Sequence, residues 1–164
     1  MSRFTPQDLA FADTATWTFD FQGLVTGTPA EVWAAITDNE SWTVWFKRCS
    51  ACRATSDPFG GVGSTRFIQV NGLRVYEQFI AWEPEELWAF TVTDMTPRFA
   101  DAMVERATFH AVDDRHTRID YRIAVHPTWW AKPLRRLVAG QSAKSFTASF
   151  ARLDQYLAAR RAEA

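Results

Sequence analysis

The apolar positions near the carboxyl end of the chain repeat with the period of an α-helix. Phe146, Phe150, Leu153 and Leu157 are spaced at i, i+4, i+7 and i+11, which places them on one helical stripe. We therefore predict one long helix over residues 132–161. At 1.5 Å per residue, this helix would span roughly 40–45 Å.

A glycine interrupts this helix near its middle. Gly140 costs about 1 kcal/mol in a helix interior relative to alanine, so we interpret it as a bend or a point of close packing. The side chains around it are small, namely Ala139, Ser142, Ala143 and Ser145. Small residues in the middle of a helix and bulky ones at its end leave space against a facing sheet. We expect a cavity there, and ordinary tight packing is the alternative.

Most of the chain before this helix alternates between apolar and polar residues, which is typical of half-buried strands. The first such run covers residues 14–25, with Trp17, Phe19, Phe21 and Val25 on one side. Six further runs follow, at about residues 50–56, 64–71, 73–82, 87–95, 103–112 and 117–125. The connections between these runs are short, and one of them is the hairpin signal Asn-Gly at residues 71–72. Short connections predict an antiparallel meander.

Two short helices are expected between the first and second strands. Thr28 and Glu31 have the spacing of a capping box, and Pro29 suits the first position of a helix. This helix should end near residues 38–39, and a second one should cover about residues 40–46. Residues 1–13 are expected to form a short polar lead-in. The order of elements predicts a single α+β domain over residues 1–164, in which a curved seven-stranded antiparallel sheet surrounds the long helix.

Composition narrows the classes of function. The chain has 164 residues, 47% of them hydrophobic, and a formal net charge of −1, which argues against a nucleic-acid partner. No apolar run approaches the roughly 20 residues of a membrane span, and the amino-terminal residues do not resemble a signal peptide, so we expect a cytoplasmic protein. Aromatic residues are unusually frequent at 15%, which suits either a large core or a pocket for a flat ligand.

The two cysteines form a C-x-x-C motif that needs its own explanation. Cys49 and Cys52 are predicted to open a strand, where residues three apart point to opposite faces. A redox motif would instead open a helix, and a zinc site would need two more ligands, for which the three histidines have no suitable spacing. We therefore expect neither redox chemistry nor a metal at this motif.

Several short segments, taken together, resemble a known family. They are residues 25–33 (VTGTPAEVW), 36–38 (ITD), Trp42, residues 45–46 (WF), 61–66 (GVGSTR), 71–77 (NGLRVYE), 81–84 (AWEP) before Leu87, and 117–121 (TRIDY). With the order of elements, they resemble the START/Bet v 1-like (SRPBCC) superfamily and its polyketide cyclase/dehydrase and lipid-transport branch, over about residues 16–160. The resemblance implies a helix-grip fold, with a deep and mostly apolar cavity between the sheet and the long helix. It does not fix a function.

The alternation along the strands predicts which side chains face that cavity. Glu77 and Glu105 are the acids expected to look inward, where an apolar environment would raise their pKa and suit them to general acid–base catalysis. The alternative is that they pair with an arginine such as Arg66. Tyr121 could donate a hydrogen bond to a ligand, and these two acids and this tyrosine are the catalytic candidates. The predicted ligand-binding residues are Phe21, Trp45, Val75, Glu77, Phe79, Phe90, Glu105, Phe109, Tyr121, Ser142, Phe146 and Phe150.

Three functions fit this sequence. The first is binding or transport of a small hydrophobic ligand such as a lipid, a polyketide or an aromatic metabolite. The second is an aromatase/cyclase enzyme without a metal or organic cofactor, which a clustered set of interior polar residues would favour. The third is a protein-interaction module like the superfamily's chaperone activators or ribosome-binding toxins, which an exposed apolar patch or a basic surface would favour. His126 is expected to be structural, and homodimer formation is left open.

Overall fold

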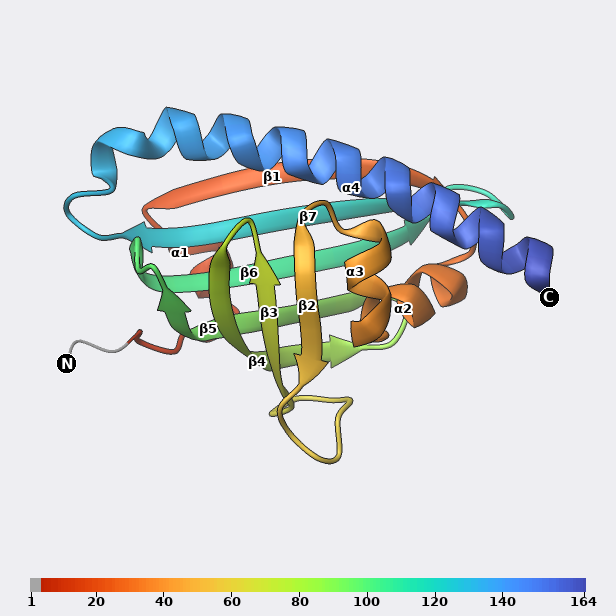
Figure 1. The fold of residues 1–164 in the computed structure, drawn as a ribbon, viewed down its shortest axis with the longest axis horizontal. Coiled ribbons are helices and arrows are strands. Elements are labelled where there is room, and N and C mark those ends of the chain that lie inside the picture. The colour runs from red at the N-terminus through yellow and green to blue at the C-terminus, as the bar shows by residue number, and fades with distance from the viewer. Residues whose placement is uncertain (1–3) are drawn as a thin grey trace.

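The computed structural model describes residues 4–164 and contains a strongly curved sheet with one long helix lying across it (Figure 1). The elements are α1 (Phe11–Thr14), β1 (Trp17–Thr26), α2 (Pro29–Thr37), the 3-10 turn η1 (Asn39–Ser41), α3 (Trp42–Trp45), β2 (Cys49–Ala54), β3 (Thr65–Val70), β4 (Leu73–Glu83), β5 (Leu87–Thr96), β6 (Ala100–Ala111), β7 (His116–Pro127), the 3-10 turn η2 (Lys132–Leu134) and α4 (Arg135–Glu163). The predicted α+β helix-grip fold is confirmed.

All seven strands belong to one antiparallel sheet, whose order is β1-β7-β6-β5-β4-β3-β2. Every neighbouring pair from β2 to β7 is consecutive in the chain, as the short connections predicted. β1 instead pairs with β7, so the first and last strands of the chain are neighbours. The curved sheet and α4 enclose the hydrophobic core, to which Phe146, Phe150, Leu153 and Leu157 contribute the predicted stripe.

The two short helices after β1 begin and end where the sequence signals place them. The side chain of Thr28 accepts a hydrogen bond from the Glu31 amide, and the Glu31 carboxylate accepts one from the Thr28 amide at 2.7 Å. This reciprocal pair satisfies two amide groups that the first helical turn leaves without a partner. In the second helix, Trp42 and Trp45 are both buried.

The amino-terminal segment is more structured than the predicted polar lead-in. Residues before Phe4 lie outside the described part of the chain, but Phe4 and Ala12 are buried and α1 packs against β6 and β7. Asp13 forms ion pairs with Arg106 at 3.1 Å and Arg122 at 2.8 Å, which fasten α1 to the outer face of these strands. The prediction was wrong here because these partners are more than 90 residues away in sequence.

The cysteine motif does open a strand, but the two thiols do not point to opposite faces. Cys49 and Cys52 are both buried in the core and both are free. The pairing of β2 with β3 shifts register between Cys49 and Ala51, and such a bulge changes the alternation of side chains along the strand. Burial raises the pKa of the Cys52 thiol to about 12, so it is held as a thiol at neutral pH.

The closest approach of α4 to the sheet occurs at a glycine other than the predicted one. Gly140 is exposed, and a Cβ atom there would have nothing within 4 Å, so the prediction of close packing at Gly140 was wrong. A Cβ atom on Gly23 of β1 would instead lie 2.5 Å from Cγ of Phe150 and 3.0 Å from its Cβ. Only a residue without a side chain lets β1 and α4 approach this closely.

No helix in residues 4–164 combines the length and the apolar character of a transmembrane span.

The two glycines give a matched pair of substitutions. Gly23→Ala should lower the free energy of unfolding by about 1–3 kcal/mol, because the new methyl group overlaps the base of the Phe150 side chain, which cannot swing away. Gly140→Ala should be neutral or raise the free energy of unfolding by up to about 1 kcal/mol, since alanine has a higher helix propensity than glycine at an exposed position inside a helix. Urea unfolding measures both. Equal stability of the two variants would contradict the described approach of α4 to β1.

Candidate functional site

The cavity expected between the sheet and the long helix is present. It has a volume of about 630 Å³, within the usual range for ligand pockets. Its rim is formed by exposed residues of three loops, of η2 and of the first half of α4, namely Arg48, Asn71, Trp130, Leu134, Gln141 and Lys144. Its apolar wall includes Phe19, Ile68, Val75, Phe90, Met95, Phe99, Met103, Ile123, Val125 and Phe146.

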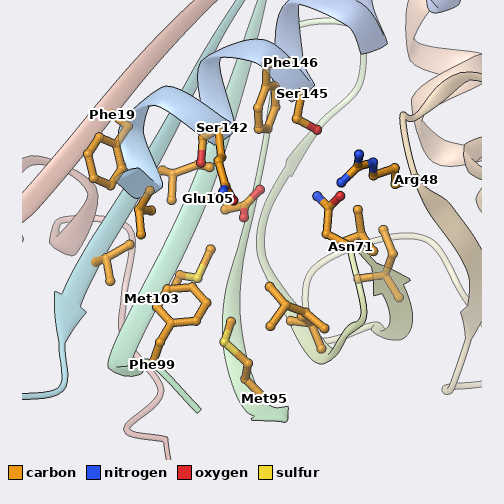
Figure 2. A pocket seen from close by; sticks show the side chains of 18 of the residues that line it. Phe19, Arg48, Asn71, Met95, Phe99, Met103, Glu105, Ser142, Ser145 and Phe146 are labelled. Atoms are coloured by element: carbon orange, nitrogen blue, oxygen red, sulfur yellow. The ribbon is translucent and has the colours of Figure 1, made fainter. Parts of the chain in front are cut away.

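The cavity exists because the side chains of α4 change size along the helix. Ser142 and Ser145 face the sheet from α4, and Figure 2 shows Ser142 close to Glu105, with Met103, Phe99 and Met95 farther along the cavity. One turn later the helix presents Phe146, whose ring stacks on that of Phe21 with centroids 4.6 Å apart. The small residues therefore leave space over the sheet, and the aromatic residues close it at one end.

Seven of the twelve predicted ligand-binding residues lie in the wall of the cavity: Val75, Glu77, Phe90, Glu105, Tyr121, Ser142 and Phe146. The other five do not line it. Trp45 packs against Trp42 and Phe46, Phe79 against Phe59 and Trp82, Phe109 against Trp33, Phe21 on Phe146, and Phe150 over Gly23. For Phe21, Phe79 and Phe109, strand parity predicted the inward direction but could not show that other aromatic side chains fill that part of the interior.

A buried ion pair lies in the wall of the cavity. Arg66 of β3 and Glu77 of β4 are directly paired across the sheet, and Nε of Arg66 donates a hydrogen bond of 2.7 Å to Oε2 of Glu77. Their side chains are 1% and 4% exposed. Cζ of Arg66 also lies 4.4 Å from the ring centroid of Trp42, a cation–π arrangement that helps to hold the guanidinium away from water.

The environment shifts the pKa of both partners. Burial raises the pKa of the Glu77 carboxyl, and the guanidinium beside it offsets part of that rise. Burial acts to lower the pKa of Arg66, but the Glu77 carboxylate outweighs it, so the pKa of Arg66 is raised and the arginine stays charged. Because a buried guanidinium needs a counter-charge, we describe the pair as ionised.

A second polar pair shares the same interior. The Tyr121 hydroxyl on β7 donates a short hydrogen bond to Oε2 of Glu105 on β6. Glu105 retains some accessible surface because it faces the cavity. Burial, reinforced by the nearby Glu77 charge, raises the pKa of Glu105 to about 8, while the Tyr121 hydrogen bond opposes the rise. Burial and the Glu105 charge also raise the pKa of Tyr121. Near neutral pH, both are therefore proton-bearing groups.

The two pairs leave one strong donor without a partner. Within residues 4–164, Nη2 of Arg66 and Nε1 of Trp88 are buried nitrogen atoms that make no hydrogen bond. Of these two residues, Arg66 lines the cavity. An unsatisfied buried donor is costly. Nη2 of Arg66 has almost no accessible surface, so an acceptor atom of a bound molecule would remove that cost only after the arginine side chain shifts towards the cavity.

Arg66 was predicted only as a possible partner of an acid, and its pairing with Glu77 confirms that alternative, but its place in the cavity wall was not predicted. Its signal was available: Arg66, Ile68 and Val70 share one face of β3, so the arginine had to follow the apolar residues inward. The rim contribution of Trp130 and the wall contribution of Phe99 carried no comparable signal, because both lie in or next to loops.

The remaining candidates lie outside the cavity. His126 is exposed and its Nδ1 atom is 2.7 Å from the Thr16 hydroxyl. In the described part of the chain, no group of three or more histidine, cysteine, aspartate or glutamate side chains is arranged to hold a metal ion.

Comparison with known proteins places the chain in a family. The model of the family described as "Polyketide cyclase / dehydrase and lipid transport" matches residues 16–158. The chain belongs to this family. Uncharacterised proteins of Mycobacterium tuberculosis and Mycobacterium bovis are 30% identical over 106 residues, and this match spans 63% of the chain and 63% of each relative's own length.

Many solved structures share the fold of this chain. The Zhui aromatase/cyclase from Streptomyces sp. R1128 superposes with a TM-score of 0.74 at 11% identity, covering 88% of this chain and 94% of that one. A START superfamily protein from Mycobacterium smegmatis superposes with a TM-score of 0.69 at 11% identity, covering 85% and 98%. At these identities the likeness concerns the fold alone. The family match over residues 16–158 confirms the predicted resemblance to the polyketide cyclase/dehydrase and lipid-transport branch.

The buried ion pair should respond strongly to loss of either partner. Glu77→Gln or Arg66→Met should each lower the free energy of unfolding by about 3–5 kcal/mol, because one buried charge is left alone. The double variant Arg66→Met/Glu77→Leu should lower the free energy of unfolding by much less than the sum of the two single effects, because no buried charge is left alone. Arg118→Ala, which removes a partly exposed ion pair, should lower it by less than about 1 kcal/mol. Urea unfolding of the set measures the coupling. Additive single effects would contradict a buried ionised pair.

Glu105 should make stability depend on pH. Between about pH 4.5, its ordinary pKa, and about pH 8, the folded protein holds a proton that the unfolded chain has lost. The free energy of unfolding should therefore fall as the pH rises through this range. Glu105→Gln should flatten this slope. Tyr121→Phe should keep it, because loss of the Tyr121 hydrogen bond, which lowers the pKa of Glu105, leaves that pKa raised. Unfolding series at pH 5 to 9 measure this effect, and an unchanged slope in Glu105→Gln would contradict it.

Proposed function

We propose that this protein binds a small hydrophobic molecule that carries at least one oxygen acceptor, and that it does so in the cavity under α4. The observation that carries this proposal is a mostly apolar cavity of about 630 Å³ with a buried polar cluster in its wall. The cluster consists of Arg66, Glu77, Glu105 and Tyr121. Lipids, polyketides and aromatic metabolites are the ligand classes that combine an apolar body with such an oxygen. We keep a cytoplasmic location as part of this proposal.

The cavity wall and the cluster have separate tasks. The wall provides affinity, because burial of apolar surface contributes about 25 cal/mol per Å² before the entropic costs of binding. The cluster provides orientation. Nη2 of Arg66 is a charged donor without a partner, and a ligand carbonyl oxygen that reaches it after a small shift of the arginine side chain would satisfy it. The carboxyl proton of Glu105, whose Oε2 accepts the Tyr121 hydrogen bond, offers a second donor to the ligand.

A second candidate function, acid–base catalysis on a carbonyl compound, is favoured by the clustering of these interior polar groups. A protonated carboxyl with a pKa of about 8 is suited to proton transfer near neutral pH. In a β-hydroxy ketone, Glu105 could give its proton to the departing hydroxyl, which leaves as water. The resulting carboxylate could then take the proton of the α-carbon, which restores the acid and leaves an enone. The Streptomyces neighbour is an aromatase/cyclase, which supports testing this reaction class.

Ligand binding can be tested with a matched pair of probes. 2-Acetylnaphthalene and 2-isopropylnaphthalene have similar shapes, but only the first has an acceptor oxygen. Both should displace a fluorescent apolar probe such as 1-aminoanthracene from the protein. The ketone should bind about tenfold more tightly, because one hydrogen bond to a charged group is worth about 1.5–3 kcal/mol. Arg66→Met should remove this preference.

The control for this binding assay lies on α4 itself. Ser142→Trp places a large side chain in the cavity and should abolish binding of 1-aminoanthracene, whereas Ala143→Trp, on the exposed side of the same turn, should leave it unchanged. Equal binding by the two variants would contradict a site in this cavity. The second candidate function is tested by incubating the protein with a β-hydroxy ketone and detecting loss of water by mass spectrometry. The wild-type protein should catalyse this loss, and Glu105→Gln should not.

A further inference from the structure

Exposed hydrophobic side chains concentrate in one segment of the chain. Nine large hydrophobic residues are exposed among those described, and four of them lie within residues 129–137, which we call the basic-aromatic segment. They are Trp129, Trp130, Leu134 and Leu137, with exposed fractions of 82%, 45%, 38% and 56%. Leu134 and Leu137 are three residues apart at the start of α4 and therefore neighbours on one face of the helix.

The exposure of this segment is imposed by the surrounding structure. Both the amide and the hydroxyl of Thr128 donate hydrogen bonds of 3.0 Å to the carbonyl oxygen of Phe99. Ala131, which follows the two tryptophans, is 1% exposed. Thr128 and Ala131 thus fasten the chain on both sides of Trp129 and Trp130, which keeps these two indole rings at the surface.

The same segment is strongly basic. Lys132, Arg135 and Arg136 are exposed, and none of them lies within 4.0 Å of a carboxylate in the described part of the chain. The sequence contains no aspartate or glutamate between Asp120 and Asp154. The net charge of the chain is −1, so this local excess of positive charge is a feature of the segment and not of the whole protein.

The segment also borders the cavity. Trp130 and Leu134 belong to both, and the basic residues Arg48 and Lys144 lie elsewhere on the same rim. Figure 1 shows the connection from β7 to α4 at one end of the molecule, far from the carboxyl terminus. The mouth of the cavity is therefore bordered by the exposed side chains of Trp130 and Leu134 and by basic side chains that make no ion pair among the described residues.

We propose that the basic-aromatic segment docks on the surface of a membrane that contains anionic lipids. Tryptophan prefers the boundary between headgroups and acyl chains, where its ring is buried and its N–H group stays hydrated. Lysine and arginine are attracted to anionic headgroups, and a combination of apolar and basic residues gives reversible attachment without a spanning helix. A bilayer surface accepts both kinds of side chain at once, which is the combination that residues 129–137 present.

Docking would bring the mouth of the cavity against the bilayer. If the cavity binds a hydrophobic ligand as proposed above, that ligand could pass between membrane and protein without crossing water. The attachment itself does not require a ligand. Vesicle binding and ligand binding are therefore measured separately. A negative result in one assay does not contradict the proposal that the other assay tests.

Flotation of the full-length protein with vesicles tests the proposal. The protein should float with vesicles of phosphatidylcholine and phosphatidylglycerol (70:30) at low salt, and about tenfold less with pure phosphatidylcholine or in 0.5 M NaCl. Trp129→Ala/Trp130→Ala and Lys132→Glu/Arg136→Glu should each reduce binding to the anionic vesicles about tenfold. The matched controls are Leu24→Ala, an exposed leucine on β1, and Arg115→Glu/Arg152→Glu, which changes the charge by the same amount elsewhere. Both controls should bind like the wild type, and circular dichroism verifies that every variant is folded.

Several results would overturn the proposal. The first is absence of binding to the anionic vesicles. Equal binding to neutral vesicles would show that the positive charges do not contribute to docking. Binding of Trp129→Ala/Trp130→Ala at the wild-type level would show that the basic-aromatic segment is not the docking surface. Light scattering gives the last test: a dimer of the wild type that Trp129→Ala/Trp130→Ala dissociates would mean that a second copy of the chain covers these residues. In the first and the last of these cases the segment would be assigned to a protein partner instead.

Discussion

The organisation of the interior depends on the burial of one charged pair in mostly apolar surroundings. Removing a guanidinium and a carboxylate from water costs several kcal/mol each, and only close pairing offsets this cost. Arg66 and Glu77 meet directly across β3 and β4, so the sheet itself fixes their distance. Burial, reinforced by the nearby charge of Glu77, pushes the next carboxyl in the same interior, Glu105, towards its protonated form, and Glu105 accepts a hydrogen bond from the Tyr121 hydroxyl. The ion pair thus adds to the effect of burial on the protonation of this cluster.

The cavity that contains this cluster results from the distribution of side-chain size along α4. Aromatic packing around Phe146 and Phe150 closes the sheet at one end, and the approach of Phe150 to Gly23 holds the helix against β1. Ser142 and Ser145 then lie over the open part of the sheet without filling it. A rigid attachment at one end and small side chains at the other leave a cavity that the surrounding structure maintains.

Much of this arrangement could be predicted from local sequence, and the exceptions have physical reasons. Strand alternation placed Glu77 and Glu105 inward, as observed, because a two-residue period is a property of the backbone. The same rule failed at Cys49 and Cys52, where a bulge shifts the register. A bend or a point of close packing was expected at Gly140 because of the glycine, yet close approach needs two partners, and the sequence gives no sign of which strand faces a given helical turn. How far aromatic residues fill the interior likewise depends on contacts between distant elements.

The central claim is that the cavity under α4 holds an apolar molecule whose oxygen contacts the cluster of Arg66, Glu77, Glu105 and Tyr121. Native mass spectrometry of the purified protein, followed by extraction and identification of the bound compound, tests this claim most directly. The account predicts a near-stoichiometric apolar compound with at least one carbonyl or hydroxyl oxygen, which Ser142→Trp excludes. A protein that is free of ligand when purified and that shows no thermal shift with any member of a panel of lipids and polyphenols would contradict it.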